Sequence, residues 1–256
     1  MIIPRQYLGK RQGASITEGN MVYQFEDLVN TLPHRLTPYD DLSYQESKAY
    51  FSQSQMILSA GEWTVHSAMA LDSNNGIYIT GSGYHTILKC GPNNTAGVMV
   101  VNGDDVVIEN VKFSRTTDSS VPDVGSLLHV TGERVVIRNC WFDASNALNA
   151  ITANVADNLT IESCVFAGGA GDIVYVLDSD NTMVKNNRIV PVAGWDSVAY
   201  NAIFLASTNT GVVAQRCNDG IIVGNHVGSG SRIRHNNTGA HMLAGNNTSA
   251  ILVGYP

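Results

Sequence analysis

The segment Glu133-Arg-Val-Val-Ile-Arg-Asn-Cys-Trp-Phe142 decides the fold, because the chain repeats its pattern three more times. The copies are Asp104-Asp-Val-Val-Ile-Glu-Asn-Val-Lys-Phe113, Asp157-Asn-Leu-Thr-Ile-Glu-Ser-Cys-Val-Phe166 and Asp180-Asn-Thr-Met-Val-Lys-Asn-Asn-Arg-Ile189. Each copy has an acid, a polar residue, two strand residues, an aliphatic residue, a charged or polar residue, Asn or Ser, two variable residues and a large apolar residue. The copies begin at residues 104, 133, 157 and 180. Each interval suits one coil of three short strands and three turns, at about 3.3 Å per strand residue.

The repeat predicts an all-β chain that folds as a single-stranded parallel β-helix, a solenoid of about seven or eight coils over residues 55–256. Equivalent positions should stack from coil to coil at about 4.8 Å. The template puts two apolar stacks inside, and one turn position would carry an Asn ladder whose amides bind the coils above and below. The first apolar stack should contain Ile108, Ile137, Ile161 and Val184, and the second Phe113, Phe142, Phe166 and Ile189. The ladder should contain Asn110, Asn139, Ser163 and Asn186.

Residues 1–54 differ from the repeat region and are predicted to form an N-terminal arm or cap. Apolar residues at Phe25, Leu28, Val29 and Leu32 share one helical face, and residues 44–51 suit a second short helix. Two interpretations stay open. The segment either covers the first coil, where strand edges would be unpaired, or docks on a partner.

Composition excludes several classes of protein. The formal net charge is −7 and Lys and Arg are scattered, which argues against nucleic-acid binding. No stretch is apolar enough to span a membrane, and the N-terminus has no secretory pattern, so we expect synthesis in a cytoplasm. None of the four cysteines forms a CxxC pair, which argues against zinc. Cys140 and Cys164 occupy equivalent repeat positions and should be neighbouring reduced thiols rather than a disulfide.

Short β-type runs also close the chain, at 220–224, 232–237, 241–247 and 250–253. They suit either the faces of the last coil or a terminal β-structure shared between chains. No polar capping helix follows them, and the last strand of an uncovered solenoid has unpaired backbone groups that can bind another chain. We therefore expect a second chain to cover this end.

A family resemblance begins at the segments Gly61-Glu-Trp63, Ile79-Thr-Gly-Ser-Gly83 and Thr86-Ile-Leu88, with Leu71 between the first two. Together with the repeated Ile-x-Asn-x-x-Phe coils, they resemble the pectate-lyase-like right-handed β-helix superfamily. The resemblance implies a right-handed coil. It does not imply one function, because the fold hosts lyases, hydrolases, epimerases and non-catalytic phage spike and decoration proteins.

The sequence gives little support for catalytic residues. Asp104 and Asp105 sit at the repeated acidic turn and are interpreted as turn formers. Asp178 and Asp180 could present two carboxylates, with Asp172 and Arg188 near them, for general acid–base chemistry.

The remaining polar candidates do not form a site on sequence grounds. Arg232-Ile-Arg234 reads as a strand, Gly81-Ser-Gly83 as a turn, and His129, His235 and His241 lack a metal-binding spacing. The sequence thus assigns no catalytic, cofactor or metal residue and predicts a protein without enzymatic activity.

The resemblance and the chain's organisation favour a virion structural protein of a tailed phage. It would be a trimeric β-helix decoration (cement) or spike protein, made in the host cytoplasm and joined to other virion proteins through residues 1–54. A host surface glycan is a further partner. The alternatives are a polysaccharide lyase or hydrolase, or a glycan-binding protein that uses Trp63, Trp141, Trp195 and exposed tyrosines as stacking platforms.

Overall fold

A computed structural model describes residues 34–36, 55–190, 201–206, 220–227, 232–235, 241–244 and 250–253, with gaps at 66–67, 72–75, 92–93, 95, 116–123, 146 and 169. The two helices predicted in residues 23–32 and 44–51 therefore lie outside the described residues, as does Trp195. In the described part of the chain every regular element is a strand. No helix among these residues is long and apolar enough to cross a membrane.

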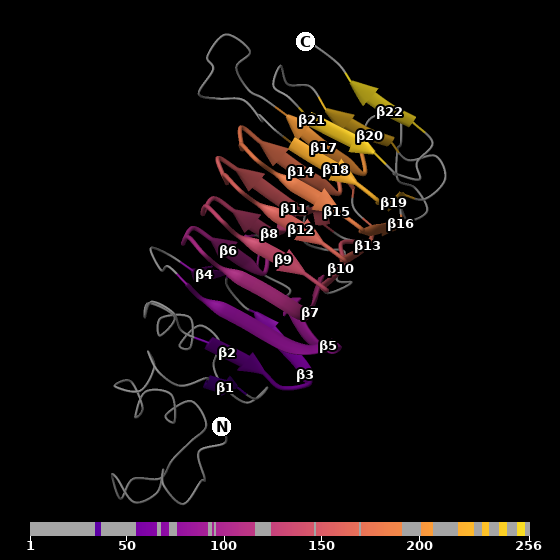
Figure 1. Cartoon of the computed structure of the whole chain (residues 1–256). Helices are drawn as coiled ribbons and strands as arrows, with labels where there is room; N and C mark the ends of the chain where they lie inside the picture. Colours follow the sequence, from indigo (N-terminus) through magenta and orange to yellow (C-terminus); the bar gives the residue numbers. More distant parts are fainter. Residues whose placement is uncertain are drawn as a thin grey trace, which may run out of the picture.

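The strands stack in parallel into two sheets that wind around one core (Figure 1). They are β1 (His34–Leu36), β2 (Gln55–Leu58), β3 (Gly61–Val65), β4 (Met69–Leu71), β5 (Tyr78–Cys90), β6 (Met99–Val101), β7 (Val107–Arg115), β8 (Val124–Val130), β9 (Val136–Arg138), β10 (Trp141–Asp143), β11 (Ala147–Asn154), β12 (Thr160–Glu162), β13 (Val165–Ala167), β14 (Val174–Leu177), β15 (Met183–Lys185), β16 (Arg188–Val190), β17 (Ile203–Ala206), β18 (Gly220–Val223), β19 (His226–Val227), β20 (Arg232–His235), β21 (His241–Ala244) and β22 (Ala250–Val253).

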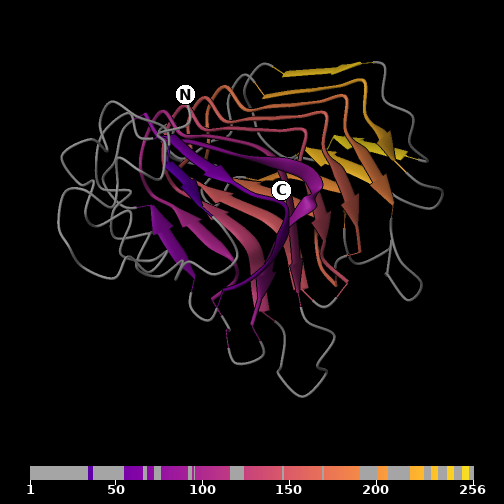
Figure 2. The ribbon, with the colours of Figure 1, turned by 90° about the horizontal axis from the view of Figure 1, so that it is seen from below.

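Three faces result from these two sheets, as the view along the stack shows (Figure 2). The eight-stranded sheet runs β22-β20-β17-β14-β11-β8-β6-β4 and makes one face. The fourteen-stranded sheet makes the other two, because the long strands β5 and β7 continue through the corner between them. The ladder β9-β12-β15-β18-β21 extends from one half of β7, and the ladder β10-β13-β16-β19 from the other.

The predicted right-handed parallel β-helix is confirmed. About five of its turns are regular. The eight-stranded sheet has one strand per coil, which accounts for the rest of the seven or eight coils expected. After β16, residues 191–200 and 207–219 lie outside the description. Beyond them, β18 and β21 extend the first sheet and β20 and β22 extend the second, all in parallel register. The last strands thus continue the faces of the coil, which was one of the two sequence interpretations.

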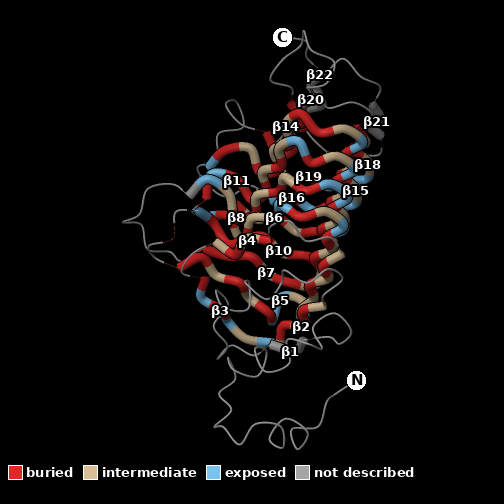
Figure 3. The backbone as a smooth tube through the Cα atoms, turned by 90° about the vertical axis from the view of Figure 1, so that its left-hand side faces the viewer, coloured by how far each residue is buried: buried red, intermediate tan, exposed pale blue. Residues whose placement is uncertain are grey.

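Both predicted apolar stacks lie inside the coil (Figure 3). Ile108, Ile137, Ile161 and Val184 pair in register along β7, β9, β12 and β15. Along the other stack, the ring centroids of Phe113 and Phe142, and of Phe142 and Phe166, are 4.9 Å apart with the planes nearly parallel. That separation equals the strand spacing, so each ring rests on the ring of the coil below.

The predicted Asn column forms a turn, but the buried amide ladder lies one residue further along the chain. Asn110, Asn139, Ser163 and Asn186 have φ between 52° and 58°, the left-handed region that Asn tolerates. At the next position, the buried Asn187 donates through Nδ2 to the Ile161 carbonyl at 3.0 Å and accepts the Cys164 N–H at 2.8 Å.

Asn225 repeats this pattern one coil further on. Its Oδ1 accepts the Asn187 N–H at 2.9 Å and its Nδ2 donates to the Val184 carbonyl at 2.9 Å. The amides face inward because the turn directs the next side chain into the core. There they bind backbone groups that would otherwise be buried without a partner.

Cys140 and Cys164 fill the same inner column in the coils below, as neighbouring free thiols. Each donates a weak hydrogen bond to a backbone carbonyl: Cys140 to Arg138 and Cys164 to Glu162, both with sulfur–oxygen distances of 3.3 Å. Burial, with the neighbouring Cys140 thiol, raises the pKa of Cys164 well above its ordinary value, so the thiol stays protonated.

Val155 provides a test of how the turns limit stability. Its φ is 54° and its side chain is 58% exposed, so a β-branched residue occupies a left-handed turn with little packing in return. Val155→Asn should raise the free energy of unfolding by about 1 kcal/mol, measured by urea denaturation. Val190→Asn, at a comparably exposed valine in β16, is the control and should not stabilise the protein. Equal effects of the two changes would contradict this explanation.

Candidate functional site

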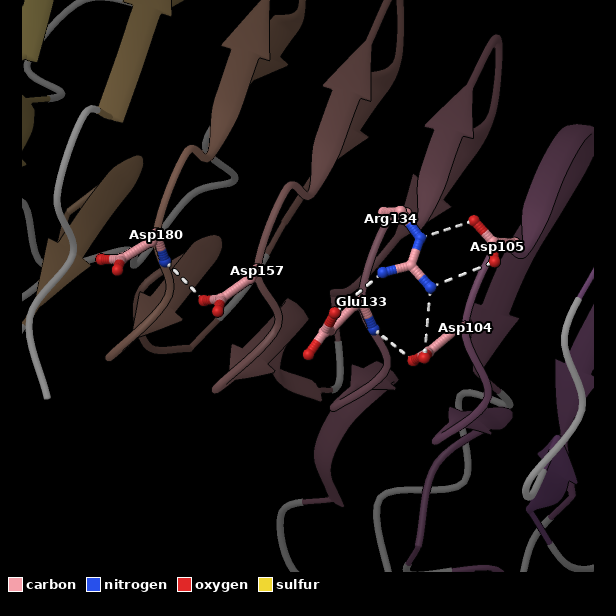
Figure 4. A network of polar contacts seen from close by, with 6 residues as sticks. All are labelled: Asp104, Asp105, Glu133, Arg134, Asp157 and Asp180. Atoms are coloured by element: carbon pink, nitrogen blue, oxygen red, sulfur yellow. Dashed lines mark hydrogen bonds and ion pairs between the residues drawn. The ribbon is translucent and has the colours of Figure 1, made fainter. Parts of the chain in front are cut away.

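The column of acidic turn residues connects one coil to the next (Figure 4). Asp104 Oδ1 accepts the Glu133 N–H at 2.8 Å, and Asp157 Oδ1 accepts the Asp180 N–H at 2.8 Å. Each of these carboxylates therefore caps a backbone donor of the following coil. This geometry gives the repeated acids a structural role between coils.

Arg134 binds the carboxylates around it (Figure 4). Its Nε lies 2.7 Å from Asp105 Oδ1, its Nη1 2.8 Å from Glu133 Oε2, and its Nη2 3.3 Å from Asp104 Oδ2. The hydrogen bond from Arg134 lowers the pKa of Asp105, while the carboxylates raise the pKa of Arg134. Because Arg134 lowers the pKa of Asp105, this carboxyl does not resemble one held ready to take up a proton.

The other candidate carboxylates lie before and after β14. Asp178 follows the end of β14 and is buried, with φ of 47°, whereas Asp172 precedes the start of that strand. Asp172 Oδ1 accepts the Asn201 N–H at 2.5 Å and the Asn201 Nδ2 at 2.7 Å. Arg188 opens β16, with β15 between it and Asp180. The chain thus places Asp178 and Asp180 in the same connection between β14 and β15, with Asp172 before β14 and Arg188 after β15.

The histidines and Trp63, which the sequence analysis considered, lie in the described strands. His235 and His241 lie in β20 and β21, in different sheets, and His129 lies in β8. In the described part of the chain, no three His, Cys, Asp or Glu side chains come together as a metal site would require. Trp63, predicted as an exposed platform, is 1% exposed in the core, so that interpretation was wrong.

A second polar column runs up the outer surface of β7, β9, β12 and β15. Glu109, Arg138, Glu162 and Lys185 occupy one register position, so charge alternates from coil to coil. Arg138 Nε lies 2.5 Å from Glu109 Oε2, and Lys185 Nζ 2.7 Å from Glu162 Oε2. The charged position of the repeat template marked this column. The pairing follows from the parallel register, which the sequence alone does not show.

Glu109 is the most enclosed member of this column, with its side chain 12% exposed. The Tyr78 hydroxyl donates to its Oε1, and Asn110 Nδ2 lies 3.2 Å from the same oxygen. Burial opposes ionisation of Glu109, but the hydrogen bonds from Tyr78 and Arg138 outweigh it and lower the pKa of the carboxyl. Burial and the adjacent carboxylate raise the pKa of Tyr78. Tyr78 is therefore a hydrogen-bond donor to an ionised glutamate.

An aromatic cluster stands on the surface where β5 and β10 approach each other. The Tyr84 side chain is 56% exposed, and Trp141 is half-buried on the outer side of β10. Their ring centroids are 5.9 Å apart in an edge-to-face arrangement, and the His85 ring lies 3.9 Å from Tyr84. The sequence indicated Trp141 and exposed tyrosines as stacking platforms but did not single out Tyr84, whose position depends on an irregularity in β5.

The eight-stranded sheet differs from both other faces in its charge. Its strands β4, β6, β8, β11, β14 and β17 contain no Asp, Glu, Lys or Arg within their described bounds. The outward column through these strands contains Val100, His129, Thr152, Tyr175 and Phe204, which are in register, and Arg234 of β20 follows Phe204 at the end of the column. Burial lowers the pKa of His129, so the column from Val100 to Phe204 is uncharged at neutral pH.

Comparisons with known proteins bear on the fold. The family model described as a right handed beta helix region matches residues 50–189. No curated protein matches the chain. Among solved structures, YbhC of Escherichia coli is 12% identical, with a TM-score of 0.60, and the match covers 96% of this chain and 78% of that one.

Two further matches are weaker. A rice weevil pectin methyl esterase is 13% identical, with a TM-score of 0.48, over 97% of this chain and 94% of that one. ORF18 of Geobacillus virus E2 is 11% identical, with a TM-score of 0.35, over 98% of this chain and 60% of that one. At these identities the likeness to YbhC shows a shared fold and nothing further.

The Glu109 contacts predict a dependence of stability on acid. Because the folded-state pKa of Glu109 lies below its ordinary value of about 4.3, its ionised form stabilises the fold at higher pH. This contribution is lost as the pH falls through the lowered pKa. The difference in unfolding free energy between the parent chain and Glu109→Gln should therefore shrink on acidification from about pH 5. Glu62→Gln, on an exposed carboxylate, is the control. A difference that stays constant with pH would contradict the assignment.

Proposed function

The chain belongs to the right-handed β-helix family, and we propose that it is a non-catalytic structural protein of a tailed-phage virion. In this proposal it forms a homotrimer on the particle surface, as a decoration (cement) or spike protein. Its binding to other virion proteins would use residues 1–54. The protein would be made in the host cytoplasm and reach its final place on the virion.

The observation that carries this proposal is the uncharged face of the eight-stranded sheet. Six successive strands of that sheet contain no Asp, Glu, Lys or Arg, while the next strand, β20, carries Arg232 and Arg234 and the two other faces carry charged columns. Exposed surfaces of soluble proteins rarely lack charge over such a length, and depletion of charge is typical of the centre of a protein–protein interface. Tyr175 and Phe204, with centroids 5.5 Å apart, supply the aromatic side chains that such centres favour.

A second copy of the chain fits this face in size. The six uncharged strands, about 4.8 Å apart, give a height of roughly 25 Å, and their lengths of three to eight residues give a width of about 10–26 Å. The resulting several hundred Å² approach the ~800 Å² that each partner contributes to a stable interface. An identical chain also explains why the face has no charge pattern to recognise a different, charged partner. In a trimer with three-fold rotational symmetry, every protomer would use this same face for its contacts.

The acidic residues support a structural role over a catalytic one. Asp104 and Asp157 bind backbone N–H groups of the next coil, and Asp105 is held by Arg134. A general acid or base must exchange protons with a substrate, which requires a carboxyl that is not committed to such contacts. These three acids contribute to the contacts between coils, as a rigid virion component would require.

The oligomer is tested by light scattering on the purified full-length chain. We expect a mass of three times the 27.5 kDa of one chain. The double change Tyr175→Lys and Phe204→Lys should lower the mass to that of a monomer, because it would bury unpaired charge in the interface. Val190→Lys, at an exposed residue of β16, should leave the trimer intact. A parent chain that is monomeric at micromolar concentration would contradict the proposal.

The virion location is tested on particles released by lysis of the source culture and purified on a density gradient. Mass spectrometry should find the chain at many copies per particle, in proportion to the capsid or tail proteins. The tagged full-length chain should bind particles that lack it, whereas a chain without residues 1–54 should not. Recovery of the chain only in the soluble fraction would overturn this location.

A further inference from the structure

We propose that Tyr84 and Trp141 form a binding platform for a glycan, on which the apolar face of a pyranose ring stacks. This site goes beyond the structural role and does not depend on it. It lies on β5 and β10 of the fourteen-stranded sheet, away from the uncharged face assigned to assembly. A trimer and a glycan site can therefore exist together, and either can fail without the other.

The platform is built by an insertion in β5. Gly83 pairs with Val111 and Ile87 with Lys112, so residues 84–86 of β5 have no counterparts in β7. Three extra residues at this point form a bulge that lifts Tyr84 and His85 off the sheet. Gly83 allows the bulge, because its φ of 69° is in the left-handed region.

Thr86 fixes the base of the bulge. Its side chain is fully buried, and its hydroxyl donates to the Ser59 carbonyl at 3.1 Å and accepts the Ser82 N–H at 2.8 Å. Gly81 packs so closely on the sheet that an added Cβ would lie 2.6 Å from the Asn110 carbonyl oxygen. The insertion is thus anchored at both sides of Tyr84, which places the ring in advance of binding and lowers the entropy lost when a ligand binds.

Tyr84 reaches across a coil to Trp141. In register, Trp141 follows Lys112, which itself follows Ile87, so the two aromatic residues belong to coils that are not adjacent. The edge-to-face contact holds the rings against each other, while more than half of the Tyr84 side chain stays in water. An anchored aromatic residue with this exposure provides apolar area at a low entropic cost, a property that binding surfaces share.

Charged side chains flank the rings and supply hydrogen-bonding groups. Lys112 lies beside Trp141 in the adjacent strand, and Asp143 lies two residues beyond Trp141 on the same side of β10. Lys112 Nζ and Asp143 Oδ2 are 3.9 Å apart, and their side chains are 30% and 42% exposed. A pyranose has a C–H face that suits an aromatic ring and hydroxyl groups at its edge that suit a lysine and a carboxylate. Ligand sites combine an apolar surface with a few polar groups in this way.

The same groups disfavour a nucleic acid as the ligand. Stacked bases also lie on aromatic rings, but binding of a phosphate backbone requires a cationic groove. Here Asp143 accompanies Lys112, and the chain carries a net charge of −7. A sugar polymer does not need that groove, so it fits the platform better.

The test uses saturation-transfer NMR on the full-length protein with four probes at millimolar concentration: the methyl glycosides of glucose, galactose, mannose and galacturonic acid. Stacking depends on the ring rather than on linkage, so at least one probe should receive saturation through its ring protons and quench Trp141 fluorescence. Tyr84→Ala should weaken that binding about five- to tenfold, the loss of one aromatic contact. Tyr84→Phe should retain it, since the ring carries the stacking.

Tyr175→Ala is the matched control, because it removes a surface aromatic residue from the other sheet. It should leave binding of the probe unchanged, whatever it does to the mass in solution. Failure of all four probes to bind, or equal binding by the parent chain and Tyr84→Ala, would overturn the platform. Stronger binding of the galacturonic acid probe alone would support it and assign Lys112 to the carboxylate, which Lys112→Gln would then abolish.

Discussion

Every part of this molecule depends on parallel backbone pairing between one coil and the next. The pairing holds equivalent residues about 4.8 Å apart, so a side chain must fit the copy of itself above and below as well as its own coil. Phe113, Phe142 and Phe166 meet this requirement as parallel rings. Asn187 and Asn225 meet it through a hydrogen bond between adjacent coils, in which the Asn187 N–H donates to Asn225 Oδ1 inside the core. Turn positions meet it with left-handed residues that recur at fixed points.

Positions that recur in every copy of the template could be predicted from the sequence, whereas positions outside the template could not. The Ile and Phe stacks were predicted because the template states them residue by residue. The regular template ends at Ile189, and spacing alone could not divide the remaining chain into turns, which only the strand pairing shows. The amide ladder was placed one residue early. Both the turn and the core position carry Asn in that copy, and only the backbone shows which one faces inward.

Positions that depend on contacts between distant residues were harder to predict. Trp63 and Trp141 both lie in short strands, yet Trp63 is in the core and Trp141 is half-buried at the surface. Tyr84 had no signal, because its exposure comes from extra residues in β5 that only the pairing with β7 reveals. The paired charges of Glu109 and Arg138 were visible as a charged column, but their contact needed the register.

The stack also sets the size of the molecule in discrete steps. Each added coil lengthens the solenoid by about 4.8 Å and cannot lengthen it by less. The segments that begin at Glu133 and Asp157 are nearly interchangeable, so gain or loss of such a unit leaves the neighbouring coils in register. The number of coils therefore works as a molecular ruler. It fixes how far the final strands stand from the first, and evolution can adjust that reach by duplicating a short stretch of the gene.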